Sequence, residues 1–177
     1  MRFSAILALA AAALAAPVAQ DATGPFALKT ISTNANYNGL YVAGYHVGAA
    51  TDLAVLSQPS SGLDSVFRNF YFNTTFSGGL GEGFLVYPIQ ANTNPIQLMA
   101  QLNFDVSSNT APLYISVQPP IYDFSFDANG HLLLTGLDRW YACITQSAYG
   151  PQLAVNWVMG SGSLDGQNCE KISLVKA

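Results

Sequence analysis

Short apolar runs separated by glycine, asparagine, proline and serine recur along the chain from Phe26 onward. The runs are rich in aromatic and β-branched residues, which strands favour, and none has the 3.6-residue period of a helix over helical length. We therefore expect a succession of short strands, with at most one helical turn, near Ser61–Val66. The expected strands are Phe26–Ser32, Leu40–His46, Leu53–Ser57, Val66–Asn73, Gly83–Ile89, Ile96–Phe104, Leu113–Val117, Tyr122–Asp127, His131–Thr135, Trp140–Thr145, Leu153–Val158 and Lys171–Val175.

Two asparagine–glycine pairs supply the positive φ angles that hairpins need, so Asn38-Gly39 and Asn129-Gly130 should each join antiparallel strands. Pro119-Pro120 interrupts any strand and predicts an extended connector. Short antiparallel strands at this spacing indicate an all-β, single-domain antiparallel β-sandwich or closed barrel. A weak threefold echo in the sequence keeps a β-trefoil as the alternative.

The N-terminus has the pattern of a secretory signal peptide. Met1-Arg2 is followed by an apolar run, Phe3–Leu14, and by the small-x-small signal Ala13-Leu14-Ala15. The run is too short to span a bilayer of about 30 Å as a helix. We expect a signal peptide at 1–15, a flexible segment at 16–25 and one β-rich extracellular domain at 26–177. The expected location is secreted, either extracellular or in a cell wall.

Charged residues are scarce in the chain. After removal of Arg2 with the signal peptide, five basic residues face ten acidic ones, a net charge of −5. The basic residues are scattered, which argues against nucleic acid as a partner. No later stretch reaches 18 apolar residues and the C-terminus lacks an apolar tail, so we expect no membrane anchor.

The two cysteines and one sequon suggest covalent features of an exported protein. Cys143 and Cys169 are expected to form one disulfide, with two free thiols or a metal pair as the other interpretations. Asn73-Thr74-Thr75 is the one Asn-x-Ser/Thr sequon, and it predicts a glycan at the surface on Asn73 in a eukaryote.

We find no catalytic motif, metal-ligand spacing or cofactor signature in the sequence. His46 and His131 stand alone in predicted strands, and the Gly160–Gly166 segment is interpreted as a loop, not as a nucleophile elbow. Ser–His catalysis assembled in space and a hydrolase with paired carboxylates remain open alternatives.

The acidic residues favour turns over catalysis. Asp123 and Asp127 are separated by about 13 Å along a strand, which is too far for a glycosidase pair. Asp127 is better explained as a turn former than as part of a calcium loop. Glu82 lies in a glycine-rich stretch, expected to be a loop, and has no assigned role.

Aromatic residues are the feature that could bind a ligand. Tyr37, Tyr41 and Tyr45 surround the first predicted hairpin, and Trp140 precedes Cys143. Exposed aromatic rings stack on the apolar faces of sugars, whereas buried ones fill a core. We take these four as candidate ligand-binding residues and expect the neighbouring Tyr141 and Trp157 to be in the core.

Motifs at both ends of the mature chain occur in an order that resembles small secreted ascomycete proteins related to the fungal cell-wall protein phiA, grouped as a domain of unknown function. The motifs are Phe26-Ala-Leu28-Lys-Thr-Ile31, Asn38-Gly39-Leu40-Tyr41-Val42, Phe124-x-Phe126, Gly130-x-Leu132, Gly136, Trp140-Tyr141-Ala142-Cys143, Pro151-Gln152-Leu153, and Cys169 followed by Ile172-x-Leu174. The resemblance implies a location in the wall or at the hyphal or spore surface of a fungus. It supplies no catalytic residues.

Together these features predict a non-enzymatic secreted protein that associates with the fungal cell wall or hyphal surface through glycan contacts. Its partner would be a cell-wall polysaccharide or an extracellular protein. The alternatives are a secreted effector or antigen that binds a host or competitor protein, and a secreted hydrolase.

Overall fold

The computed structural model describes residues 22–58, 70–74, 82–91, 94–105, 108–118, 123–160, 164 and 168–177. Several sequence-based predictions fall wholly or partly outside these residues. They are the signal peptide at 1–15, the first part of the flexible segment at 16–25, the helical turn at Ser61–Val66, the start of the strand Val66–Asn73, the connector at Pro119-Pro120 and most of the Gly160–Gly166 loop.

The described residues form an all-β structure without a helix. Within them, no helix is long and apolar enough to cross a membrane. The strands are β1 (Ala22–Phe26), β2 (Leu28–Ile31), β3 (Tyr41–Gly48), β4 (Thr51–Ser57), β5 (Phe70–Asn73), β6 (Glu82–Ala91), β7 (Asn94–Leu102), β8 (Thr110–Ser116), β9 (Phe124–Phe126), β10 (Leu132–Leu134), β11 (Trp140–Ser147), β12 (Gly150–Val158), β13 (Cys169–Lys171) and β14 (Ser173–Lys176).

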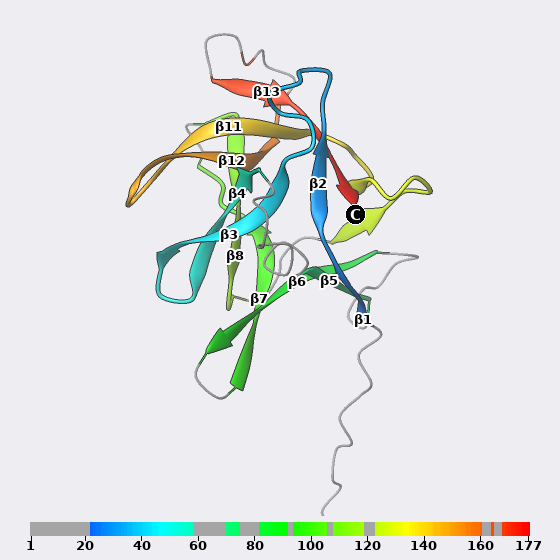
Figure 1. Ribbon diagram of the computed structural model, residues 1–177, viewed down its shortest axis with the longest axis vertical. Coiled ribbons are helices and arrows are strands. Elements are labelled where there is room, and N and C mark those ends of the chain that lie inside the picture. Colours follow the sequence, from blue (N-terminus) through cyan, green and yellow to red (C-terminus); the bar gives the residue numbers. More distant parts are fainter. Residues whose placement is uncertain are drawn as a thin grey trace, which may run out of the picture.

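All strand pairs are antiparallel and belong to one sheet, whose main path runs β1-β5-β6-β7-β8-β12-β4-β3-β2-β14. The C-terminal strand β14 therefore lies beside β2, near the start of the described chain (Figure 1). The sheet is not closed. The all-β antiparallel architecture is confirmed, whereas the closed-barrel form, and the trefoil that would also be built on a closed barrel, do not fit the open sheet.

Three strands meet near the middle of the sheet. β12 pairs with β11 along one edge, and its other edge meets β4 at Val55 and β8 at Pro112. β8 also pairs with β4, through Tyr114 opposite Leu53. One edge of β8 thus bonds to β12 along its first half and to β4 along its second half, while its other edge pairs with β7. The β11–β12 and β3–β4 hairpins therefore follow each other along the same edge of β8.

The core lies inside the bend of this sheet, and Trp140 is at its centre. The indole is fully buried, crosses Trp157 at 4.9 Å and stacks with Phe124 at 6.3 Å between ring centroids. Its Nε1 donates a hydrogen bond of 2.7 Å to the carbonyl oxygen of Leu132 on β10. Because a buried indole N–H needs a partner, this bond fixes β10 over the core.

Where they fall within the described residues, the predicted strands are confirmed in position, with two interruptions. The first predicted strand, Phe26–Ser32, is divided at Ala27, whose N–H and C=O both bond to Ala177. The last one is likewise divided at Ile172, whose N–H donates to the carbonyl of Trp140. β1 begins at Ala22, inside the segment expected to be flexible. Long-range backbone bonds of this kind leave no local sequence signal.

Both asparagine–glycine pairs lie in loops that join antiparallel strands, as predicted. Gly39 and Gly130 each have a φ of 80°, which a residue with a side chain rarely adopts. Gly39 belongs to the loop between β2 and β3, and Gly130 to the turn between β9 and β10.

The C-terminus is held against the N-terminal strands by a lysine. The Lys176 ammonium lies 4.1 Å from the ring centroid of Phe126 and 4.8 Å from that of Phe26, with Phe72 at 5.8 Å. Its backbone N–H donates to the carbonyl of Gly130. Burial lowers the pKa of Lys176. These contacts join β14, β1, β5 and the β9–β10 hairpin at one corner of the sheet.

A Gly83→Ala substitution should destabilise the sheet. At this point β6 passes so close to β5 that an added Cβ would lie 2.5 Å from the carbonyl oxygen of Asn73. We expect a loss of about 1–3 kcal/mol in the free energy of unfolding, measured by chemical denaturation. Gly48→Ala is the matched control, because a Cβ there would have no neighbour within 4 Å. Equal stability of the two variants would contradict this account of β5–β6 packing.

The predicted disulfide is confirmed. Cys143 on β11 and Cys169 on β13 face each other across neighbouring strands, with their Cα atoms 4.1 Å apart, and close a loop of 26 residues.

Replacing both cysteines with alanine should lower the free energy of unfolding by about 3 kcal/mol, because the unfolded chain regains the entropy of the open loop. The melting temperature, followed by circular dichroism, should then fall by roughly 10 °C. Two titratable thiols in the native wild-type protein, or an unchanged melting temperature, would argue against the bond.

Candidate functional site

The candidate site is a hollow on the outer face of the sheet, beside Tyr114. Along β8, Ala111, Leu113 and Ile115 are fully buried in the core. Because side chains alternate along a strand, Tyr114 and Ser116 project to the opposite face. They line a hollow of about 740 Å³ together with residues of β7 and of the β3–β4 and β11–β12 hairpins. We call it the first hollow.

Its walls consist of uncharged polar and aromatic side chains. None of the described residues that line the first hollow carries a formal charge. The amides come from Gln101, Asn103 and Gln146, and the rings from Tyr114 and Phe104, which is 42% exposed. Such a surface offers hydrogen-bond donors and acceptors beside apolar ring faces.

Part of the polar wall is already ordered by internal hydrogen bonds. The side-chain amide of Gln101 donates to the hydroxyl of Ser116, which also accepts the backbone N–H of Gln118 at 3.2 Å. On the opposite hairpin, the Ser147 hydroxyl donates to the carbonyl of Gly150 at 2.7 Å. These bonds hold Gln101, Ser116 and Ser147 in place, so this part of the wall is formed without a ligand.

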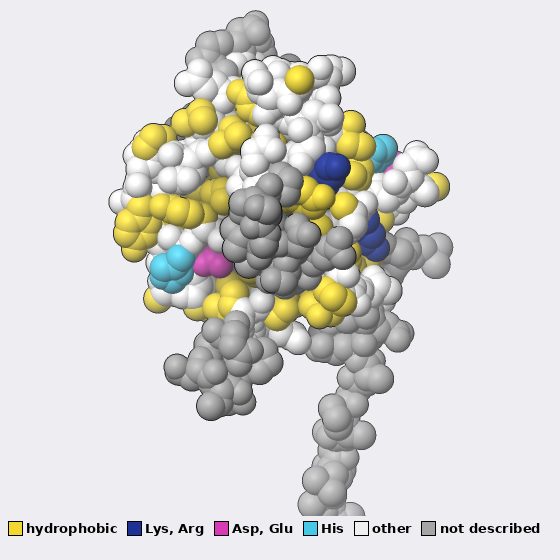
Figure 2. All heavy atoms as spheres, viewed as in Figure 1, with side chains coloured by type: hydrophobic (Ala, Val, Ile, Leu, Met, Phe, Trp, Pro, Cys, Tyr) yellow, Lys and Arg dark blue, Asp and Glu magenta, His cyan; other side chains and the backbone are white. Residues whose placement is uncertain are grey.

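Aromatic residues continue beyond the hollow onto the neighbouring hairpins. Tyr149 follows the lining residue Ala148, is 63% exposed and meets the ring of Tyr45 edge to face at 6.4 Å. Figure 2 shows hydrophobic side chains over the tip of the β11–β12 hairpin. On this face, outside the grey atoms, hydrophobic and uncharged polar side chains predominate and charged ones are few.

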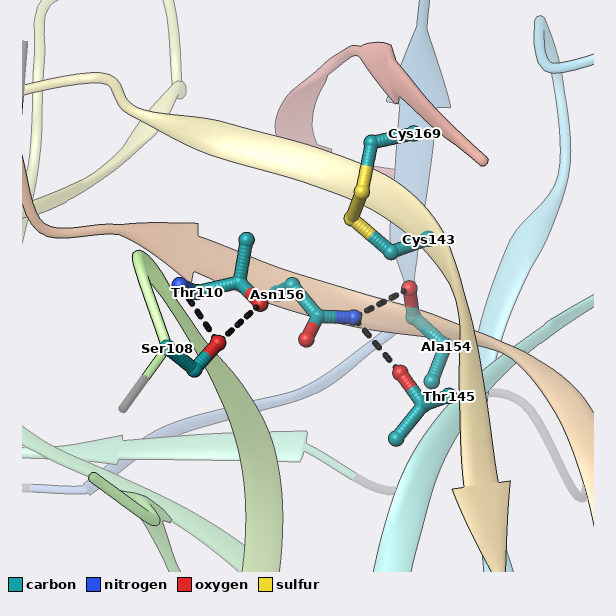
Figure 3. Close-up of a disulfide and its surroundings, with 7 residues drawn as sticks. All are labelled: Ser108, Thr110, Cys143, Thr145, Ala154, Asn156 and Cys169. Carbon is teal, nitrogen blue, oxygen red and sulfur yellow. Dashed lines mark hydrogen bonds between the residues drawn. A yellow bond between two sulfur atoms is a disulfide. The ribbon is translucent and has the colours of Figure 1, made fainter. Parts of the chain in front are cut away.

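A second hollow, of about 540 Å³, adjoins the first and includes the disulfide in its lining. Figure 3 shows its inner part, where Asn156 lies between the Ser108–Thr110 pair and Thr145, below the Cys143–Cys169 bond. The Asn156 amide nitrogen donates to the Thr145 hydroxyl at 2.9 Å and to the carbonyl of Ala154 at 3.1 Å.

The structure places the four candidate aromatic residues in different environments. Tyr45 contacts the ring of Tyr149, which follows the lining residue Ala148, but neither tyrosine lines the first hollow. Tyr37 packs against the core. Tyr41 is partly buried, with the Lys29 ammonium 5.8 Å from its ring centroid. The prediction that Trp140 contacts a ligand is wrong, because its ring is fully buried in the core.

The two neighbouring aromatics that we assigned to the core also differ from each other. Trp157 is buried, as predicted. Tyr141 is only partly buried and lies under the Lys171 ammonium, 5.5 Å from its ring centroid, so its assignment to the core is wrong.

Each histidine pairs with an aspartate. His131 Nδ1 lies 2.9 Å from Asp127, and the same carboxylate accepts the backbone N–H groups of Asn129 and His131. The backbone bond from His131 is the main reason that the pKa of Asp127 lies below its usual value, against an opposing effect of desolvation. Asp127 is therefore the turn former that we predicted.

The second pair, His46 and Asp52, lies 3.3 Å apart on β3 and β4. Asp52 projects to the opposite face of β4 from Thr51, which lines the first hollow. The pair is thus directed away from the candidate site. Glu82, expected in a loop, instead begins β6 and faces Ser125.

Among the described residues, no three histidine, cysteine, aspartate or glutamate side chains gather as a metal site requires. The described basic residues all contact other residues of the protein. Lys29, Lys171 and Lys176 lie over aromatic rings, and Arg139 donates to the carbonyls of Met159 and Gly160.

Sequence reasoning missed Tyr114 and the amides around it. In the structure, the segment Thr110–Ser116 alternates between partly exposed and buried residues up to Ile115. In the sequence, Tyr114 stands between Leu113 and Ile115, so its outward direction had no clear signal. Gln101 and Gln146 gave no signal, because only the pairing of distant strands brings them to the same hollow.

The fold and the first hollow define a small all-β protein with a surface hollow whose described lining is uncharged. The chain belongs to a family described as a domain of unknown function, DUF7907, which it matches over residues 23–177. Comparison with curated proteins and with solved structures gave no match.

Asn73 should remain unmodified when the protein is expressed in a fungal host. The expected surface position of its sequon is wrong, since the side chain is only 5% exposed and its strand pairs with β1 and β6. A glycan on this buried side chain would have no space in the folded protein. Mass spectrometry should show a mass that does not change on deglycosylation, and a mass loss would contradict the placement of β5.

Proposed function

We propose that this is a secreted, non-enzymatic protein of the fungal cell wall or hyphal surface that binds a neutral wall polysaccharide in the first hollow. The observation that carries the proposal is the lining of the hollow, which combines aromatic rings and amides without a charged side chain among the described residues. Ligand sites typically join apolar walls with a few polar groups that fix orientation.

The chemistry of the hollow suits sugars in two ways. A sugar ring has apolar C–H faces, which can stack on Tyr114 and on the exposed part of Phe104. Its hydroxyl groups both donate and accept hydrogen bonds, and the side-chain amides of Asn103 and Gln146 also do both. A charged polymer would find no ionic partner here, so a neutral glycan is favoured.

Two further observations support an extracellular role without catalysis. The signal-peptide pattern and the resemblance to phiA-related wall proteins favour export, and the disulfide is typical of exported proteins. The described lining of the first hollow includes no histidine, carboxylate or thiol to act as acid, base or nucleophile. The internal contacts of the basic residues argue against nucleic acid as a partner.

The proposal is tested by co-sedimentation of the mature protein with insoluble chitin, β-glucan and cellulose. We expect retention by at least one polymer with a dissociation constant in the micromolar range. Tyr114→Ala should weaken that binding by about tenfold or more, which corresponds to about 1.4 kcal/mol of lost stacking. Gln146→Ala, which changes an exposed side chain, should weaken it by a smaller factor.

Tyr41→Ala is the matched control, because Tyr41 is partly buried on the same sheet but does not line the hollow. It should bind like the wild type. Loss of binding in Tyr41→Ala with retention in Tyr114→Ala would move the site to the first hairpin. If no polymer retains the folded wild type, the glycan proposal fails and the alternative of an extracellular protein partner takes its place.

A further inference from the structure

The two hollows adjoin each other beside β8. They share three lining residues, Asn103, Tyr114 and Gln146, so a chain long enough to extend past Tyr114 would reach from the first hollow to the second. Tyr114 thus stands at the boundary of both, and its ring can be contacted from either side.

The second hollow repeats the chemistry of the first with different residues. Hydroxyl groups come from Ser108, Thr110 and Thr145, and the apolar wall includes Pro112 and Ile144, which is 51% exposed. Asp105 is the one charged residue in its described lining. A single carboxylate in a protein of net negative charge disfavours a polyanion and is compatible with a neutral chain.

Several residues of this hollow are held by internal contacts. Asn156 is buried and donates hydrogen bonds to Thr145 and Ala154, while the Ser108 hydroxyl lies 3.1 Å from that of Thr110 (Figure 3). The disulfide holds β13 on β11 at the hollow, and the N–H of Ile144 bonds to the carbonyl of Asn168. A preformed site of this kind loses little entropy when a ligand binds.

We propose that the two hollows are consecutive subsites for one extended neutral glycan chain, which crosses Tyr114 and reaches Ile144. This inference rests on the proposed function of the first hollow and specifies its ligand as a linear oligomer that fills both hollows. A short sugar would occupy one hollow and leave the other empty, so affinity should depend on chain length.

The test is isothermal titration calorimetry of the mature protein with soluble oligomers of chitin, β-glucan and cellulose, from disaccharide to hexasaccharide. For the oligomer that binds, we expect the longest chains to bind about tenfold more tightly than the shortest that binds at all. Ile144→Ser should reduce the affinity for long chains to that for short ones and leave the short chains unaffected.

Ile31→Ser is the matched control, because Ile31 is an isoleucine on β2 with a similar exposure of 48% and lines neither hollow. It should bind all lengths like the wild type. If all lengths bind with equal affinity, or if Ile144→Ser behaves like Ile31→Ser, the second subsite is refuted while the proposed function stands. If no oligomer binds the folded protein, both proposals fail.

Discussion

The structure depends on the burial of Trp140. Its ring joins Phe124 and Trp157 in the core, its indole N–H holds the carbonyl of Leu132, and its own backbone carbonyl accepts the N–H of Ile172. One residue thereby connects β9, β10, β12 and the C-terminal segment to β11. The strands of an open sheet are stable only when one face packs against a core, and Trp140 is a central residue of that core.

The candidate site follows from the same enclosure. Since Leu113 and Ile115 are fixed in the core, Tyr114 must face outward, with β7 along one edge of β8 and the β11–β12 and β3–β4 hairpins along the other. The hollow therefore lies on the outer face of a strand whose inner face is packed in the core. Side chains on such a support are held more precisely than side chains on a loop, which suits recognition of an uncharged ligand through hydrogen bonds to its hydroxyl groups.

Local patterns explain how much of this could be predicted from the sequence. Alternating apolar residues located the strands, Gly39 and Gly130 marked loops between antiparallel strands, and the even cysteine count gave the Cys143–Cys169 bond. The order of strands in the sheet has no local signature. For that reason the open sheet, the burial of Trp140 and the meeting of Gln101 with Gln146 were not predictable, since each depends on contacts between distant segments.

The central claim is that a neutral glycan binds beside Tyr114. The most direct measurement is a nuclear magnetic resonance titration of the isotope-labelled mature protein with soluble hexasaccharides of chitin, β-glucan and cellulose. The account predicts that shifts concentrate in the side-chain amides of Gln101 and Gln146 and in the backbone of β8. Shifts centred on Tyr37 and Tyr41, or no shifts with any of the three sugars, would contradict it.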